Sequence, residues 1–282
     1  MKKPEEASGL TWQQQVWQGL TTLGGSLGAL ALYLVIPALL MCVGMIFQKG
    51  RDGASMADLS GNFYYTLGIL TTFWILWRRS KKRGSILWEE TTLFFRERSD
   101  RRLLLLFGTG FGCSLLFSGI LTLVPFPAVL MDGYVSAADG VEAGTDLFLA
   151  FLSTMALAPV MEEIVFRGYM LGGLLKGFEE QRAILISAGI FALCHISFLW
   201  MIYAFLMGIF LARVSVREDN ILYSVALHMG FNATVLPLWV LNRSGIFESA
   251  WVGPACKLAV GLGGYLLASR LYGRYRKEEL CD

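Results

Sequence analysis

Two adjacent carboxylates at the end of an apolar run are candidates for a reactive site. Glu162 and Glu163 follow a stretch from Leu147 to Met161 that holds no charged side chain. A charge at membrane depth costs at least about 2.5–3.5 kcal/mol on insertion scales, so such groups are functional candidates. The simpler alternative is that both carboxylates only form ion pairs at the polar end of a helix. The chain's other four Glu-Glu pairs lie in polar segments.

Both histidines of the chain also lie in apolar runs. His195 interrupts the run from Ala183 to Ala212, while His228 and Asn232 are four residues apart and therefore share one helix face. A carboxylate beside an imidazole in a low-dielectric site can act as a general base for water. A second histidine with an asparagine can donate hydrogen bonds to the oxyanion of an attacked carbonyl. Together these side chains favour hydrolysis by activated water.

Local spacing gives the two glutamates different roles. Glu163 and Arg167 are four residues apart, so on a helix they can form an ion pair. Glu162 is rotated by about 100° from its neighbour and is therefore the better candidate for the catalytic carboxylate. Pro159 removes a backbone donor one turn before Glu163, which predicts a kink or a local opening that admits water.

The same residues leave a metal-dependent alternative open. Glu162, His195 and His228 form a familiar zinc ligand set with a fourth position for water. Asn232 suits an oxyanion site better than a zinc shell, which favours the metal-free version. Zinc therefore stays an alternative cofactor. The five cysteines are scattered singly without a CxxC pair. We predict that they act as small buried apolar residues and form neither a zinc cage nor disulfides.

The elements that must position these residues are membrane helices. Of the 282 residues 55% are hydrophobic and only 16% are charged, with a mean hydropathy of +0.55, whereas soluble domains carry about 25% charged residues. The net charge of +2 indicates no nucleic-acid partner. We predict an all-α polytopic membrane protein whose clearest spans are roughly Leu27–Phe47, Leu59–Trp77, Leu103–Met131, Thr145–Gly172, Ile221–Leu241 and Trp251–Tyr272.

Basic residues orient the spans. The segment 78–102 contains nine Lys and Arg residues and is predicted to be cytoplasmic. The segment between the third and fourth spans has acidic residues but no basic ones, so it is predicted to face out. If 183–212 is a tight two-helix hairpin, the basic C-terminal tail also lies inside. We therefore expect about eight spans in the cytoplasmic membrane, with both termini cytoplasmic. One long helix at 183–212 would instead place the basic C-terminal tail outside.

The chain has no internal repeats and is predicted to be one membrane domain with three parts. Residues 1–144 hold a cytoplasmic amphipathic segment and the first three spans, 145–245 the catalytic core, and 246–282 the last span and the basic tail. Two glycine clusters are predicted to be close-packing faces between helices. They are Gly108, Gly110 and Gly112, and Gly261, Gly263 and Gly264.

Three ordered motifs carry a family resemblance. The segments Glu162-Glu163-Ile-Val-Phe-Arg167, Phe191-Ala-Leu-Cys-His195 and His228-Met-Gly-Phe-Asn232 match EExxxR, FxxxH and HxxxN patterns. They resemble the CPBP family of CAAX proteases and bacteriocin-processing enzymes, also called Abi. The motif-bearing part, about 145–241, is roughly a third of the chain.

The resemblance implies an intramembrane endopeptidase that cleaves a membrane-bound peptide or a lipidated protein tail. It implies that Glu162 activates water with His195 as its partner, and that His228 and Asn232 form the oxyanion site. Glu163 with Arg167 would order the helix. The family is often labelled metalloprotease, yet a metal-free glutamate mechanism fits the same residues.

Two other functions use similar residues. A proton-relay transporter also places Glu and His in the membrane, but it predicts inverted repeats and broken helices in both halves. Here the polar residues crowd into the second half of the chain. A non-enzymatic bacteriocin-immunity or scaffold protein would keep the fold, and its phenotype would survive Glu162→Ala together with His195→Ala.

Overall fold

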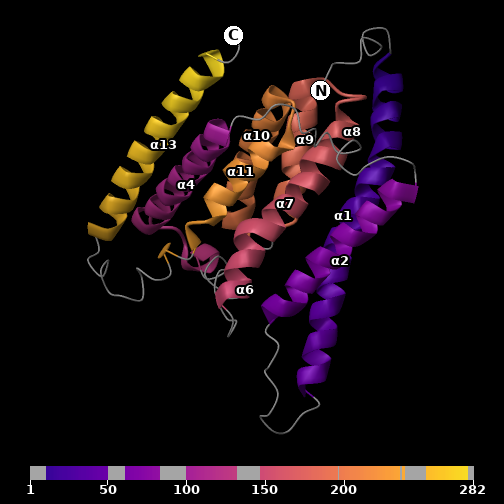
Figure 1. Cartoon of the computed structure of the whole chain (residues 1–282), viewed down its shortest axis with the longest axis horizontal. Coiled ribbons are helices and arrows are strands. Elements are labelled where there is room, and N and C mark those ends of the chain that lie inside the picture. The colour runs from indigo at the N-terminus through magenta and orange to yellow at the C-terminus, as the bar shows by residue number, and fades with distance from the viewer. Residues whose placement is uncertain are drawn as a thin grey trace. The chain divides into compact units, whose positions relative to one another are not determined.

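The structure is a computed structural model, and every element that it describes is a helix (Figure 1). The predicted all-α fold is thereby confirmed. The described residues are 11–49, 61–82, 100–131, 147–195, 197–235, 237–238 and 252–278. The chain divides into two compact units. The first comprises residues 1–94 and 134–221, and the second comprises residues 95–133 and 222–282.

The first unit begins with a long helix, α1 (Trp12–Lys49), which packs along α2 (Gly61–Lys82). Thr11 and Gln14 cap the start of α1 reciprocally: the backbone N–H of Thr11 donates to Oε1 of Gln14 at 2.9 Å, and the backbone N–H of Gln14 donates to Oγ1 of Thr11 at 3.4 Å. The stretch predicted as an amphipathic segment forms the first turns of α1 and continues directly into the first span. A Cβ atom on Gly68 would stand 2.5 Å from Cα of Pro37, so glycine allows the two helices to approach there.

The helix that carries both glutamates runs without a break through five segments. They are α6 (Leu147–Leu152), η2 (Ser153–Leu157), α7 (Ala158–Glu163), η3 (Ile164–Leu171) and α8 (Gly172–Leu174). We call this run the glutamate helix. The η segments are π-helical: the N–H of Ala158 donates to the carbonyl of Ser153, five residues earlier. Pro159 has no N–H to continue an α-helical ladder, and the departure predicted from it takes the form of this wider turn.

The run from 183 to 212 is a hairpin of two helices that pack against each other, α9 (Glu180–Leu193) and α10 (Phe198–Glu218). The second helix extends beyond the predicted end, Ala212. It ends at Asp219, whose left-handed backbone (φ 49°) terminates the helical ladder. His195 therefore lies in the connection between the two helices rather than within one.

The second unit holds α4 (Asp100–Leu123), α11 (Ile221–Asn232, from its second residue on) and α13 (Val252–Glu278). Helices α4 and α13 pack along each other. The predicted end of the third span, Met131, was wrong, because α4 ends at Leu123. Prolines follow at positions 125 and 127, and neither can donate a backbone hydrogen bond.

The span predicted from Ile221 to Leu241 can be compared with the structure only in its first part. Helix α11 ends at Asn232, and a turn at 233–234 follows it. Pro237 lies four residues after Ala233, and its ring cannot be accommodated against that carbonyl in a regular helix. The predicted end of this span, Leu241, lies outside the described residues.

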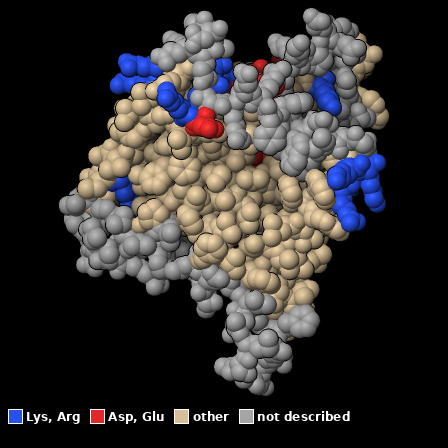
Figure 2. Space-filling model, viewed as in Figure 1, with Lys and Arg blue, Asp and Glu red and all other residues tan. Residues whose placement is uncertain are grey.

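Four of the described helical runs are long and apolar enough to cross a membrane. They are Gly24–Ile46, Asp100–Leu123, Phe148–Leu174 and Phe198–Glu218. On the face shown in Figure 2 the charged side chains lie in the upper part of the view, and the wide described surface below them carries none. The apolar helices indicate an integral membrane protein; the predicted count of eight spans is not confirmed.

Candidate active site

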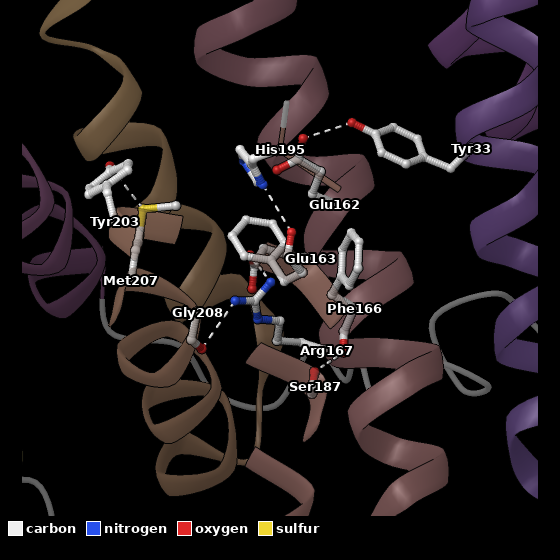
Figure 3. A network of polar contacts seen from close by, with 11 residues as sticks. Tyr33, Glu162, Glu163, Phe166, Arg167, Ser187, His195, Tyr203, Met207 and Gly208 are labelled. Atoms are coloured by element: carbon white, nitrogen blue, oxygen red, sulfur yellow. Dashed lines mark hydrogen bonds and ion pairs between the residues drawn. The ribbon is translucent and has the colours of Figure 1, made fainter. Parts of the chain in front are cut away.

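Glu163, the second residue of the Glu-Glu pair, forms a fully buried ion pair with Arg167. Nη1 of Arg167 lies 3.2 Å from Oε1 of Glu163, and the two side chains are 1% and 0% exposed. The expected i,i+4 pair is therefore present (Figure 3). Nη2 of Arg167 also donates to the carbonyl oxygen of Gly208 on α10, at 3.2 Å. The guanidinium thus attaches the glutamate helix to the α9–α10 hairpin.

One aromatic ring connects this ion pair with the histidine of the hairpin. The centre of the Phe191 ring lies 4.5 Å from the guanidinium carbon of Arg167. The same ring meets Phe166 edge-on at 5.0 Å and His195 edge-on at 4.9 Å between centroids. A cation over an aromatic face is worth about 2 kcal/mol when it is desolvated. The phenylalanine of the FxxxH motif therefore packs against both polar groups of the site.

His195 follows the end of α9 and is held at one nitrogen. Its Nδ1 lies 2.9 Å from the carbonyl oxygen of Phe191, and its ring is half-buried beside Trp200, 6.2 Å away between centroids. In the tautomer that donates from Nδ1 to this carbonyl, Nε2 is the acceptor nitrogen. The local fold therefore provides a histidine whose second nitrogen can accept a proton.

Glu162 has surroundings different from those of its neighbour. It is half-buried, and its Oε1 accepts a 2.7 Å hydrogen bond from the hydroxyl of Tyr33 on α1 (Figure 3). It also interacts electrostatically with Cys194, the residue before His195. The carboxylate thus lies near the end of α9 that carries the histidine, while Glu163 is paired with Arg167.

The sequence motifs did not indicate Tyr33. It belongs to the first apolar helix, 129 residues before Glu162, and a lone tyrosine in such a helix has no distinguishing spacing. Tyr65 on α2 was also missed, although it interacts with both Tyr33 and Glu162. Both contacts arise only from the packing of distant helices.

His228 and Asn232 lie in the second unit, on α11. His228 is buried (2% exposed), and Asn232 is the last residue of the helix and is half-buried. Helix α11 is fixed closely to α4, since a Cβ atom on Gly230 would overlap the carbonyl oxygen of Phe107. Each unit thus holds two of the four predicted catalytic residues. The prediction that these four side chains form one site is not tested by the structure.

The zinc alternative needs three ligands that lie together. In the described part of the chain, no group of three or more His, Cys, Asp or Glu side chains is placed to hold a metal ion. Glu162 and His195 supply two donors in the first unit, and the third predicted ligand, His228, belongs to the second. Within the first unit, the carboxylate of Glu162 is held by a phenol and the ring of His195 is held at Nδ1.

The comparison with known families bears on this segment of the chain. Residues 144–234 match the family model described as type II CAAX prenyl endopeptidase Rce1-like. The matched segment contains Glu162, Glu163, Arg167, His195, His228 and Asn232. The resemblance predicted from the three motifs is confirmed there, and it supports a CAAX-type membrane endopeptidase in general. No curated protein and no solved structure matches the chain.

Proposed function

We propose that this chain is an intramembrane endopeptidase in which Glu162 activates water, with His195 as its partner. The observation that carries the proposal is the placement of Glu162. It is a half-buried carboxylate held by a phenol near the histidine-bearing end of α9, inside the segment that matches the family model. Such a carboxylate is suited to act as a general base, because it is partly shielded from water and one of its oxygens is held by a hydrogen bond.

The proposed reaction needs only a water molecule and the peptide. Glu162 takes a proton from water as the oxygen attacks the carbonyl carbon, and the carbonyl oxygen gains the negative charge. His228 and Asn232 donate hydrogen bonds to this oxyanion. As the C–N bond breaks, the proton passes to the leaving amine, so that a carboxylic acid and an amine result. His195 assists by relaying this same proton at Nε2 between Glu162 and the leaving amine.

The ion pair supports Glu162 rather than Glu163 as the base. Glu163 faces a guanidinium at 3.2 Å in a fully buried environment, so we assign it, with Arg167, the role of fixing the glutamate helix against α10. An ionised carboxylate in that pair cannot take up a proton without leaving a buried cation uncompensated. Glu162 is therefore the carboxylate that we place at the substrate.

The proposed substrate is a membrane-associated protein or peptide, with a prenylated C-terminal tail as the specific candidate. The proposal rests on the match to a CAAX prenyl endopeptidase model and on the apolar helices, which are long enough to cross a membrane. A lipid-modified tail reaches such a site along the membrane, because its chain partitions into the same hydrocarbon layer.

The test compares peptide ends in cells that produce wild type, Glu162→Gln or the control Glu180→Gln. Glu180 is an exposed carboxylate in the first turn of α9, within the same matched segment. Cleavage products should disappear with Glu162→Gln and persist with Glu180→Gln, because loss of a general base costs about 10²–10⁴ in rate. Identical products from wild type and Glu162→Gln would contradict the proposal.

The metal-free form of the mechanism has its own test. Purified wild type is treated with a chelator, its zinc content is measured by elemental analysis, and cleavage is assayed in the same sample. We expect activity to persist without bound zinc. Activity that is lost with the metal and returns when zinc is added back would instead assign Glu162, His195 and His228 as ligands.

A further inference from the structure

The proposed base is held by a helix outside the segment that matches the family model. Tyr33 belongs to α1, whereas the match covers residues 144–234. Its side chain is 7% exposed, and its hydroxyl donates to Oε1 of Glu162 at 2.7 Å. This distance is typical of a well-formed O–H···O hydrogen bond. The hydrogen bond thus links the N-terminal helix directly to the site.

Helix α1 is fixed to the glutamate helix on the face that carries Tyr33. Seven residues earlier, which is two turns, Oγ of Ser26 donates to the carbonyl oxygen of Tyr169 in η3 at 2.8 Å. Ala29 and Leu30, between the two attachments, are 2% and 8% exposed. Buried contacts at this spacing along one face fix the rotation of α1 about its axis and its position along that axis. They therefore fix the position of the Tyr33 hydroxyl.

A second tyrosine supports the first. Tyr65 on α2 interacts with both Tyr33 and Glu162. Helix α2 is itself held close to α1, where the hydroxyl of Thr72 lies 3.4 Å from the carbonyl oxygen of Leu32. Two phenols from two helices therefore converge on one carboxylate of a third.

We propose that Tyr33 is a positioning residue for Glu162 and that Tyr65 supports it. The proposal rests on the proposed role of Glu162 as the base. A glutamate side chain has three rotatable bonds, and a general base must lie within about 2.6–3.2 Å of the proton that it takes. The rigid phenol fixes one carboxylate oxygen, and the carboxylate keeps enough lone pairs to accept from a water molecule as well.

The first measurement compares Tyr33→Phe with the matched control Tyr64→Phe. Both substitutions remove one hydroxyl and keep the ring; Tyr64 is a neighbouring half-buried tyrosine of α2 that packs edge-on against Phe63. The probe is a synthetic peptide that reproduces the strongest Glu162-dependent cut found in cells. We expect kcat of Tyr33→Phe to fall roughly tenfold to a hundredfold with KM unchanged, as for a misplaced catalytic group. Tyr64→Phe should behave as wild type.

A double-mutant cycle separates positioning from loss of folded protein. Glu162→Asp shortens the side chain by one methylene and withdraws the carboxylate from the phenol. If Tyr33 acts through Glu162, Tyr33→Phe should have a much smaller effect on kcat in the Glu162→Asp background than in wild type. An equal fold-loss in both backgrounds would assign Tyr33 a structural role and overturn the proposal. All rates are normalised to the monodisperse fraction in detergent.

The remaining outcomes distinguish this proposal from the proposed function. Unchanged kcat in Tyr33→Phe, with cleavage still dependent on Glu162, overturns the positioning role alone. Cleavage that does not depend on Glu162 overturns both. If Tyr33→Phe does not accumulate as folded protein, Tyr65→Phe provides the test. It removes the support without removing the hydrogen bond to Glu162, and it should lower kcat less than a hundredfold but measurably.

Discussion

The glutamate helix and the α4–α13 pair are held to their neighbours by opposite means. In the first unit, long polar and aromatic side chains reach between helices: the Arg167 guanidinium contacts Gly208, and Tyr33 contacts Glu162. In the second unit, the helices meet at their backbones. A Cβ atom on Gly112 of α4 would stand 2.7 Å from the backbone nitrogen of Tyr265 on α13.

This difference separates a chemical requirement from a packing requirement. Within a membrane, burial of apolar surface does not drive helix association, so close van der Waals contact and polar contacts must do so. Glycine contacts need only the absence of a side chain, and they position no reactive atom. A buried carboxylate must instead be matched by donors at defined distances. The first unit therefore holds the groups whose loss should be most costly.

The largest effect is expected from Arg167→Met, which keeps much of the side-chain volume but leaves Glu163 without its cation. Both groups are fully buried, and removing one partner of a buried ion pair costs about 3–5 kcal/mol. We expect a large loss of stability, measured by thermal unfolding in detergent, and a corresponding loss of activity. The control is Arg182→Met, whose pair with Glu179 is 3.7 Å long and exposed, and it should change little.

A second substitution shows whether charge is the cause. Adding Glu163→Gln to Arg167→Met removes the uncompensated carboxylate, so part of the stability should return, while a merely steric defect would persist. Arg167→Met with wild-type stability would contradict the view that the first unit depends on its buried charges.

Much of the first unit's chemistry could be predicted from local spacing. Residues four apart on a helix share a face, which predicted the pair of Glu163 and Arg167. The hairpin followed from charge balance across the membrane rather than from any local signal. These predictions depend only on helix periodicity and on the location of basic residues.

Predictions failed where proline chemistry or distant packing decides the outcome. The end of α4 was placed too late because the apolar run continues through two prolines that the helix cannot include. Tyr33 was missed because its partner, Glu162, lies 129 residues away. Glycine clusters were predicted only in part: Gly112 and Gly261 meet the facing backbone, whereas Gly263 and Gly264 meet nothing within 4 Å.

That partial agreement provides the next prediction. Gly112→Ala should destabilise the second unit by about 1–3 kcal/mol, because the added carbon overlaps the α13 backbone and the helices must separate. Gly264→Ala is the control on the facing helix, where the same carbon meets open space. It should be neutral or slightly stabilising, since alanine favours the helix over glycine. Equal unfolding temperatures for the two variants would show that the close approach of α4 and α13 is not required.

The smallest effect is expected from a polar contact between two hydroxyls of the second unit. The hydroxyls of Ser114 on α4 and Thr234, which follows α11, lie 2.6 Å apart and are buried. Hydrogen bonds between membrane helices average about 0.6 kcal/mol, so Ser114→Ala should lower stability by roughly that amount. Ser269→Ala, at an exposed hydroxyl on α13, is the matched control.

The size of that effect tests the contrast between the two units. Two neutral hydroxyls can each find another acceptor when the partner is removed, whereas removal of Arg167 takes from Glu163 the cation that lies 3.2 Å from it. Thr234→Val and the double variant complete a cycle, in which we expect a coupling well below that of Glu163 with Arg167. If the two couplings were equal, buried charge would not distinguish the first unit, and its stability would have to be attributed to apolar packing around Phe191.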